Sequence, residues 1–155
     1  MTPAINAAKK NKITYKVHQY THDPAHDSYG KEAAEQLGIT EERVYKTLVV
    51  QLDKRSLTVA VIPVSSMLSM KQIAKAAGGK KAAMADKELV KRTTGYVLGG
   101  VSPLGQKKRL LTVIDSSAKD FSTIFVSAGR RGLEIELNPD DLAALTTATF
   151  AQIRQ

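Results

Sequence analysis

Alternating apolar and polar residues mark several short segments as strands, because the side chains of a strand point to opposite faces in turn. Ile13, Tyr15 and Val17 alternate with polar residues, and a strongly apolar run covers 46–52. The chain turns at 53–56 and returns over 57–64, a pattern that predicts an antiparallel hairpin. Further short strands are expected at 80–84, 96–98, 110–114, 123–126 and 133–137.

Capping residues mark the starts of the predicted helices. Thr2 stands before Pro3, and Asn138 stands before Pro139, a pairing that favours the first helical turn. Gly38 is suited to ending a helix, since glycine adopts the left-handed conformation found there. With further caps at Ser28, Thr40, Ser69 and Asp86, helices are expected over 2–11, 28–38, 40–45, 69–77, 86–92 and from 138 onward.

Helices and strands are mixed along the chain without strict alternation, and the strands are short and separated by turns. This pattern predicts an α+β fold with a mixed, curved, barrel-like β-sheet surrounded by helices. The sequence has no internal repeat, no low-complexity stretch and no linker-like segment. We therefore expect residues 1–155 to form a single domain.

The 155 residues are 43% apolar and 25% charged, a composition typical of a soluble globular protein. The apolar stretches are too short to span a bilayer, and the N-terminus lacks the pattern of a signal peptide. A cytoplasmic location without a membrane partner is therefore expected. The sequence contains no cysteine, which excludes disulfides, a thiolate nucleophile and cysteine-ligated zinc.

The formal net charge of +8, from 23 basic and 15 acidic residues, favours a polyanionic partner. Charge alone does not distinguish tRNA from mRNA, DNA or a membrane surface. The middle third of the chain is especially basic. It is compatible with a solvated helix face or with a surface that tracks phosphates, through Lys71, Lys75, Lys80, Lys81, Lys87, Lys91 and Arg92.

All three histidines lie between positions 18 and 26. His18, His22 and His26 recur every four residues, but the strand pattern before them and Pro24 between the last two exclude a continuous helical row. A zinc site would also need a further ligand, and Asp23 or Asp27 would have to serve. Solvated loop histidines are the favoured interpretation, and no metal site is expected.

The glycine-rich segment 95–109 carries the strongest functional signal. Gly99 and Gly100 follow an apolar stretch, and a missing Cβ lets a backbone approach a ligand closely. The basic run 107–109 follows. Backbone amides beside a cationic rim suit an ester or a phosphate-bearing substrate better than a metal. A tight turn followed by solvated charges is the equal alternative.

Other candidates are isolated residues. Lys46 opens an apolar strand, where its ammonium can enter a pocket or reach the surface. Residues 127–132 resemble an anion-binding turn, but Ser127 has no activating partner in the sequence, so a catalytic triad is not expected. Tyr20 and Tyr29 flank the histidine loop, and each can stack on a base, line a pocket or pack at the core edge.

Several of these segments together resemble the YbaK/EbsC family of trans-acting aminoacyl-tRNA editing domains. The resemblance covers nearly the whole chain, and its most specific part is the block from Gly99 to Lys108. The matching segments are Thr2-Pro3-Ala4, His22-Asp23-Pro24, Val44-Tyr45-Lys46-Thr47-Leu48, Met84-Ala85-Asp86, Thr94-Gly95-Tyr96, residues 99–108 and residues 127–135.

The resemblance implies a barrel-like sheet similar to the editing domain inserted in bacterial prolyl-tRNA synthetases. It also implies hydrolysis of the ester that joins cysteine to the 3′ end of tRNA(Pro). In this family the thiol of the substrate, and not a protein side chain, is thought to attack the carbonyl and release a cyclic thiolactone. No cofactor is implied.

The resemblance assigns roles to single residues. Lys46 matches the key lysine of the family, which holds the terminal nucleotide or the carbonyl region. The backbone of Gly99 and Gly100 is expected to stabilise the oxyanion. Tyr20, Thr47 and Ser127 match positions that hold the aminoacyl group. Two pocket residues depart from the pattern, because Tyr29 stands where relatives can carry Phe and Glu134 stands where Asp occurs.

The first hypothesis is therefore a trans-editing deacylase for Cys-tRNA(Pro), with Cys-tRNA(Cys) as a second substrate. A deacylase for Ala-tRNA(Pro) or another small aminoacyl-tRNA is an alternative, since related family members act on such esters. A non-catalytic tRNA-binding module is a further alternative. Prolyl-tRNA synthetase is the protein partner that the resemblance implies, while the oligomeric state stays open.

Overall fold

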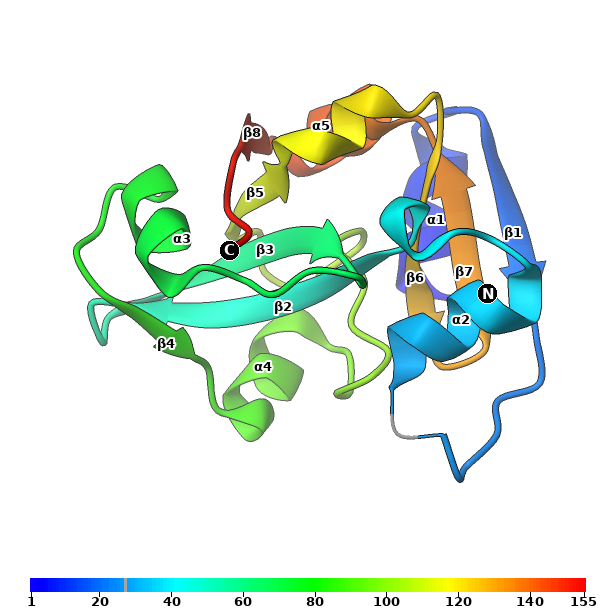
Figure 1. Cartoon of the computed structure of the whole chain (residues 1–155), viewed down its shortest axis with the longest axis horizontal. Helices are drawn as coiled ribbons and strands as arrows, with labels where there is room; N and C mark the ends of the chain where they lie inside the picture. Colours follow the sequence, from blue (N-terminus) through cyan, green and yellow to red (C-terminus); the bar gives the residue numbers. More distant parts are fainter. Residues whose placement is uncertain (27) are drawn as a thin grey trace.

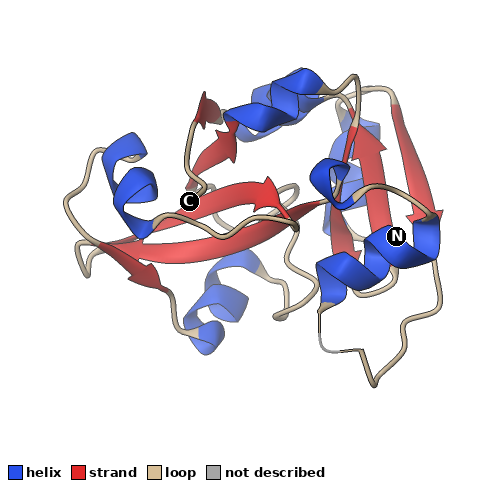
Figure 2. Cartoon of the chain, in the orientation of Figure 1, coloured by secondary structure: helices blue, strands red, loops and turns tan. Residues whose placement is uncertain are grey.

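The computed structural model describes residues 1–26 and 28–155, which form two β-sheets with helices around them (Figure 1, Figure 2). None of the described helices combines the length and apolar character that crossing a membrane requires. In chain order the elements are α1 (Pro3–Lys10), β1 (Tyr15–Gln19), α2 (Tyr29–Leu37), η1 (Glu41–Arg43), β2 (Tyr45–Leu52), β3 (Ser56–Pro63), α3 (Met70–Ala76), β4 (Ala82–Met84), α4 (Lys87–Thr94), β5 (Leu111–Asp115), η2 (Ser116–Asp120), β6 (Ile124–Arg130), β7 (Leu133–Leu137), α5 (Pro139–Thr146) and β8 (Thr149–Ala151).

The larger sheet has five strands in the order β4-β2-β3-β5-β8. Strands β2 and β3 form the expected antiparallel hairpin, in register from Tyr45 opposite Pro63 to Leu52 opposite Ser56. Strand β4 pairs antiparallel with β2, whereas β5 pairs parallel with β3 and β8 pairs parallel with β5. The sheet is therefore mixed, with the hairpin at its centre and β4 at one edge.

The smaller sheet has three antiparallel strands in the order β1-β7-β6. Its β6–β7 pair changes register between Ser127 and Arg130, where Gly129 has a φ of 113°. Such a bulge bends a strand and redirects its side chains. The irregularity lies at the end of the sheet nearest the larger sheet's β2, so it shapes the space between the two sheets.

Apolar residues from both sheets share the largest buried cluster. Tyr45, Val59 and Ile114 come from the larger sheet, and Ile124 and Ile135 come from the smaller one. Burial of such side chains contributes about 25 cal/mol for each Å² of apolar surface removed from water, which makes this cluster the main stabilising contact between the sheets. The relative placement of the sheets is thus fixed by close packing of side chains.

The prediction of an α+β fold is confirmed, but the expectation of one barrel-like sheet is wrong. Two sheets form among the described residues, and neither closes into a barrel. They meet at one isolated bridge between Val44 and Phe125, directly before β2 begins. A single bridge cannot extend into a ladder here, because the strands diverge after it to leave room for the side chains between the sheets.

The strand expected at 96–98 is also wrong. Helix α4 ends at Gly95, whose φ of 86° terminates the helix, and the chain then turns so that the Gly100 N–H donates to the Val97 carbonyl at 2.9 Å. Tyr96 is buried, and its hydroxyl donates to the Leu104 carbonyl at 2.6 Å. The apolar residues at 96–98 therefore anchor and border a loop and do not join a sheet.

The loop between β1 and α2 is held by a buried carboxylate. Glu32 is 0% exposed, and its oxygens lie 2.6 Å from His22 Nδ1 and 2.7 Å from the Asp23 N–H. Burial by itself would raise the pKa of Glu32, but the hydrogen bonds from His22 and Asp23 outweigh it and lower the pKa. This contact fixes the segment that leads from Tyr20 to Tyr29.

We expect Glu32→Ala to lower the free energy of unfolding by roughly 2 to 3 kcal/mol, because it removes a buried carboxylate that bonds both the Asp23 N–H and His22. Urea unfolding followed by circular dichroism measures this loss. The matched control is Glu35→Ala on the same helix. Glu35 contacts His26 at 3.3 Å with a side chain that is 66% exposed, so its loss costs less than about 0.5 kcal/mol. Equal losses in the two variants would contradict a structural role of Glu32.

Candidate active site

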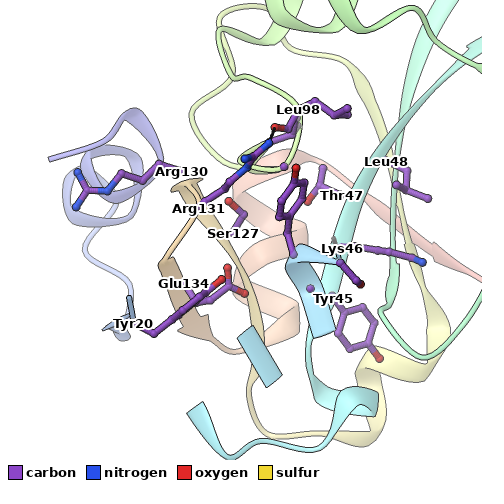
Figure 3. A pocket seen from close by; sticks show the side chains of 15 residues that line it. Tyr20, Tyr45, Lys46, Thr47, Leu48, Leu98, Ser127, Arg130, Arg131 and Glu134 are labelled. Carbon is purple, nitrogen blue, oxygen red and sulfur yellow. Dashed lines mark hydrogen bonds between the residues drawn. The ribbon is translucent and has the colours of Figure 1, made fainter. Parts of the chain in front are cut away.

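A cavity of about 310 Å³ opens between the two sheets (Figure 3). The start of β2 forms one wall, and β6 and β7 form the opposite wall. The N-terminal end of α2 and the loop after Gly95 complete it. The lining residues are Tyr20, Ser28, Tyr29, Gly30, Tyr45, Lys46, Thr47, Leu48, Leu98, Gly99, Val101, Ser127, Arg130, Arg131 and Glu134.

Most of the residues that the sequence singled out lie in this one cavity, although they span more than 100 positions of the chain. Its lining includes seven of them, namely Tyr20, Tyr29, Lys46, Thr47, Gly99, Ser127 and Glu134. Gly100 is absent from the lining. It is buried, and its N–H is already bonded to the Val97 carbonyl. Of the pair, only Gly99 therefore borders the cavity, and the oxyanion role of the Gly100 amide stays a prediction.

Gly99 occupies a position where no other residue fits without movement of its neighbours. Its φ is 89°, in the left-handed region that favours glycine. A Cβ at Gly99 would stand 2.6 Å from Tyr29 Cε2 and 2.7 Å from Arg131 Nε. The backbone thus passes directly against these two side chains, which form part of the cavity wall.

We expect Gly99→Ala to lower kcat/KM for ester cleavage by roughly 10- to 100-fold, because a shift of about 1 Å in a positioning side chain has effects of this size. Deacylation kinetics on a mischarged tRNA measures it. Gly78→Ala is the matched control, since Gly78 also has a positive φ, of 79°, but a Cβ there meets nothing within 4 Å. Equal activity of the two variants would show that the contact with Tyr29 and Arg131 does not matter.

The aromatic wall of the cavity is braced by an arginine. The Arg131 guanidinium carbon lies 3.9 Å from the centroid of the Tyr29 ring, a cation–π arrangement. Arg131 Nη2 also donates to the Leu98 carbonyl at 3.4 Å, as Figure 3 shows. Arg131 therefore connects the turn after β6, the start of α2 and the Gly99 loop.

Strand alternation separates Lys46 from Thr47, because adjacent residues of β2 face opposite sides. In Figure 3 the Lys46 side chain runs away from Ser127 and Glu134. Burial, and then the nearby Lys31 ammonium, lower the pKa of Lys46. No carboxylate of the described residues lies within 4.0 Å of its ammonium. Lys46 thus offers an uncompensated cation beside the cavity.

Thr47 has a different place. Its Oγ1 is buried and has no hydrogen-bond partner among the described residues. A buried hydroxyl without a partner costs about 1 to 3 kcal/mol. Because Thr47 lines the cavity, a polar group of a bound molecule can satisfy this hydroxyl.

Glu134 is the most perturbed acid of the cavity. It is 7% exposed, and burial raises its pKa to about 8. Tyr20 lies on the same side of the cavity (Figure 3), and burial followed by repulsion from Glu134 raises its pKa to about 12. A carboxyl with a raised pKa in a cleft is typical of functional sites, and a ligand cation would favour its charged form.

Ser127 lies at the bulge of β6, where its Oγ accepts a hydrogen bond from the Gly129 N–H at 3.1 Å. No histidine lines the cavity within the described part of the chain. Each histidine instead lies beside a glutamate, in the pairs His18–Glu136 at 2.9 Å, His22–Glu32 at 2.6 Å and His26–Glu35 at 3.3 Å. Ser127 therefore lacks the imidazole base that activates a serine nucleophile.

The histidine pairs also bear on the metal site considered from the sequence. Among residues 1–26 and 28–155, no group of three or more potential ligands gathers in one place. Asp27, which with Asp23 was one of the two alternatives for the further ligand of such a site, lies outside the described residues. The contacts of the described histidines are with carboxylates of α2 and β7.

Sequence reasoning missed several lining residues, above all Arg131 and Leu98. The segment 127–132 was recognised as an anion-binding turn, but the contact of Arg131 with Tyr29 joins residues about 100 positions apart. No local pattern encodes that contact. Tyr45 also lines the cavity. It directly precedes Lys46 and Thr47 in the sequence, and this adjacency is the signal from which its place in the site could have been predicted.

The family of aminoacyl-tRNA editing domains matches residues 22–145 of the 155. The chain belongs to this family. The match spans the whole cavity-forming part of the chain except Tyr20, so the cavity lies within the editing domain. The family expected from the sequence is thereby confirmed.

One relative matches nearly the full chain, and a second matches about three quarters of it. A protein of Enterococcus faecalis named "Putative Cys-tRNA(Pro)/Cys-tRNA(Cys) deacylase EbsC" is 41% identical over 152 residues, which cover 98% of this chain and 92% of the relative. An uncharacterised protein of Bacillus subtilis, YwhH, is 28% identical over 113 residues, or 73% of this chain and 71% of the relative.

A solved structure confirms the fold of the editing domain. The crystal structure of "a putative trans-editing enzyme for prolyl tRNA synthetase" superposes with a TM-score of 0.86 at 24% sequence identity. The superposition covers 99% of this chain and 95% of the other. The two-sheet arrangement is therefore the fold of that protein as well.

Proposed function

We propose that this protein cleaves the aminoacyl ester of mischarged tRNA in trans, with Cys-tRNA(Pro) as its main substrate and Cys-tRNA(Cys) as a second one. The observation that carries the proposal is a cavity of about 310 Å³, within an editing domain, whose described lining has no cysteine and no histidine. The name of the relative from Enterococcus faecalis supports the choice of cysteine.

The cavity favours a reaction in which the substrate supplies its own nucleophile. The sulfur of the bound cysteine attacks its own carbonyl carbon, so that a sulfur–carbon bond forms and the bond to the ribose oxygen breaks. The thiol proton passes to the departing ribose oxygen. The products are uncharged tRNA and a thiolactone, which water opens to free cysteine. Holding thiol and ester together gives this step the advantage of an intramolecular reaction.

The lining residues then divide into three roles. Glu134 binds the α-ammonium of the aminoacyl group, and Thr47 and Ser127 hydrogen-bond its polar atoms. Gly99 lets the ester carbonyl approach the backbone, which can stabilise the developing oxyanion. Lys46 points away from this group of residues and holds the terminal nucleotide through its phosphate (Figure 3).

Size selection follows from the walls of the cavity. Tyr20 and the Arg131-braced ring of Tyr29 limit the room for a side chain larger than that of cysteine. Exclusion by size alone gives about 10- to 200-fold selectivity per methylene group. A diffuse net charge of +8 attracts any tRNA and does not select one. Prolyl-tRNA synthetase, as a partner in the cytoplasm, would provide the selection of tRNA(Pro).

The test compares Cys-tRNA(Pro), Ala-tRNA(Pro) and Ser-tRNA(Pro) under single-turnover conditions. We expect rapid loss of cysteine alone, because serine has the same shape as cysteine but a much weaker nucleophile. Equal cleavage of the alanine or serine ester would overturn the thiol mechanism and establish a deacylase for small aminoacyl groups. Protection of all three esters from decay would establish a tRNA-binding module without catalysis.

A further inference from the structure

A second hollow, with a volume of about 800 Å³, lies at the tip of the β2–β3 hairpin beside β4. Four of its lining residues are cationic, and we call this surface the basic groove: Lys54, Arg55, Lys80 and Lys81. Figure 1 shows that the hairpin tip and β4 lie at the end of the molecule opposite β1. The basic groove is therefore separate from the cavity.

The backbone of the basic groove is fixed by Asp53. The Asp53 carboxylate accepts hydrogen bonds from the N–H groups of Lys80 and Lys81 at 3.1 and 2.8 Å, and the Asp53 N–H donates to the Lys81 carbonyl at 2.8 Å. These contacts tie the hairpin tip to the segment between α3 and β4. The four cationic side chains thus project from backbone that does not have to order when a ligand binds.

Lys54 occupies a costly position. Its φ is 59° and that of Asp53 is 53°, so both central residues of the turn are left-handed. Such turns favour Gly and Asn, because other residues are strained there. Strained backbone conformations cluster at functional sites. Glycine would fit this conformation of residue 54 without strain, and what Lys54 adds at this position is a positive charge.

The four cations of the basic groove outnumber its single carboxylate, Asp53, whose pKa is lowered first by the Lys81 and Lys80 N–H groups and also by the charges of Lys80 and Arg55. All four cationic residues are exposed. No carboxylate in residues 1–26 and 28–155 comes within 4.0 Å of their charged nitrogens. Several such cations along one hollow are suited to neutralising the phosphates of a nucleic acid.

The distance to the cavity fits a single ligand that reaches both places. Six residues of β2 lie between Lys46 and Asp53, and the seven steps from one to the other correspond to roughly 20 Å along an extended strand. We propose that the basic groove binds the phosphate backbone of the acceptor arm of the same tRNA whose 3′ end enters the cavity. This inference rests on the proposed function, and it assigns a docking surface to the substrate.

The test replaces all four cations of the basic groove by glutamine, in the variant Lys54→Gln, Arg55→Gln, Lys80→Gln and Lys81→Gln. The control has the same net charge and carries Lys9→Gln, Lys10→Gln, Lys12→Gln and Lys16→Gln. These residues are also exposed but lie on or near α1 and β1. Circular dichroism and thermal unfolding verify that both variants are folded.

Binding of uncharged tRNA is measured first, by fluorescence anisotropy at several salt concentrations. For the groove variant we expect about tenfold weaker binding and a slope of log K against log salt that is smaller by about 3, since each phosphate contact contributes roughly 0.7 to 0.9. The control should keep the slope. This measurement needs no catalysis, so a failure of the docking proposal is distinguishable from a failure of the proposed deacylase activity.

Kinetics with two substrates then locates the effect. For Cys-tRNA(Pro), the groove variant should have a KM about ten times that of the wild type. The cysteinyl ester of the trinucleotide CCA is too short to reach the groove, so the variant should cleave it as fast as the wild type does. Equal salt slopes for groove variant and control would overturn the proposal. So would a groove variant that binds tRNA normally but no longer binds prolyl-tRNA synthetase, because the groove would then be a protein-binding surface.

Discussion

Replacing Lys46 by methionine should slow the deacylation of Cys-tRNA(Pro) by roughly 100-fold without weakening the fold. A contact between an ammonium and a phosphate is worth up to about 3 kcal/mol, and each 1.4 kcal/mol corresponds to a factor of ten. Methionine keeps the apolar stem beside Leu48 and removes only the charge. Single-turnover kinetics with saturating and subsaturating tRNA measures the loss.

The stability of Lys46→Met distinguishes a binding role from a structural one. The lowered pKa of Lys46 means that the folded protein disfavours its charge, through burial and through Lys31. Removing that charge should leave the free energy of unfolding unchanged or raise it. Lys12→Met, at an exposed position after α1, serves as the control and should keep full activity. A Lys46→Met variant that is fully active would exclude Lys46 from the site.

The second large effect is expected at Glu134, where the wild type should lose stability as the pH rises. Its pKa is about 8 in the folded protein, compared with 4.5 in the unfolded chain. The folded state therefore binds a proton more tightly than the unfolded state between these values. The stabilising proton is fully present below pH 4.5 and is lost as the pH rises through 8.

Glu134→Gln should remove this loss, because the amide carries no charge at any pH. At about 1.4 kcal/mol for each pKa unit, the variant should be more stable than the wild type by up to roughly 4 kcal/mol at pH 9. It should also lose activity, since an amide cannot pair with the α-ammonium of the substrate. Urea unfolding at pH 5, 7 and 9 measures the first effect, and kcat/KM measures the second.

Glu136→Gln is a matched control for Glu134, two residues further along β7. Glu136 is partly exposed, and although its burial raises the pKa, hydrogen bonds from Thr123 and His18 lower it overall. Its replacement should therefore destabilise the protein above pH 5, opposite in sign to Glu134→Gln, and leave ester cleavage intact. Glu134→Asp should restore most of the activity. A Glu134→Gln variant whose free energy of unfolding equals that of the wild type at pH 5, 7 and 9 would contradict the buried environment assigned to Glu134.

The sequence predicted local elements well where a short pattern decides them. The β2–β3 hairpin was expected at 46–52 and 57–64 and spans Tyr45–Leu52 and Ser56–Pro63. The caps at Thr2 and Asn138 both accept hydrogen bonds from the first turns of α1 and α5. Periodicity and capping act within a few residues, so they can be found without knowledge of the remaining chain.

Long-range packing was beyond the reach of these patterns. The division into two sheets depends on where strands diverge after the Val44–Phe125 bridge, and no residue type marks that point. The short strand β8 pairs with β5 far back in the chain and carries too few residues for a periodic signal. The apolar run at 96–98 predicts a strand, but in the structure it combines a buried Tyr96 with an exposed Val97 and Leu98 in a loop.

The candidate site followed from the family resemblance more than from chemistry. Tyr20, Thr47 and Ser127 carry no motif of their own, and only their match to an editing domain placed them in one pocket. The hydrogen bond from the Gly100 N–H to the Val97 carbonyl depends on the turn of the loop, which the pair of glycines does not specify. The sequence did not predict the contact of Arg131 with Tyr29, because this contact exists only once strands β6 and β7 and helix α2 are assembled.

The cavity has its walls on two different sheets, and this gives the family a route to new amino-acid preferences. Thr47 belongs to one sheet and Ser127 and Glu134 belong to the other, so the width of the pocket equals the spacing between sheets. That spacing depends on buried side chains such as Val59 and Ile135, which do not line the cavity. Evolution can thus retune which aminoacyl groups are removed by changing residue volumes in the interior, while every residue that faces the substrate stays the same.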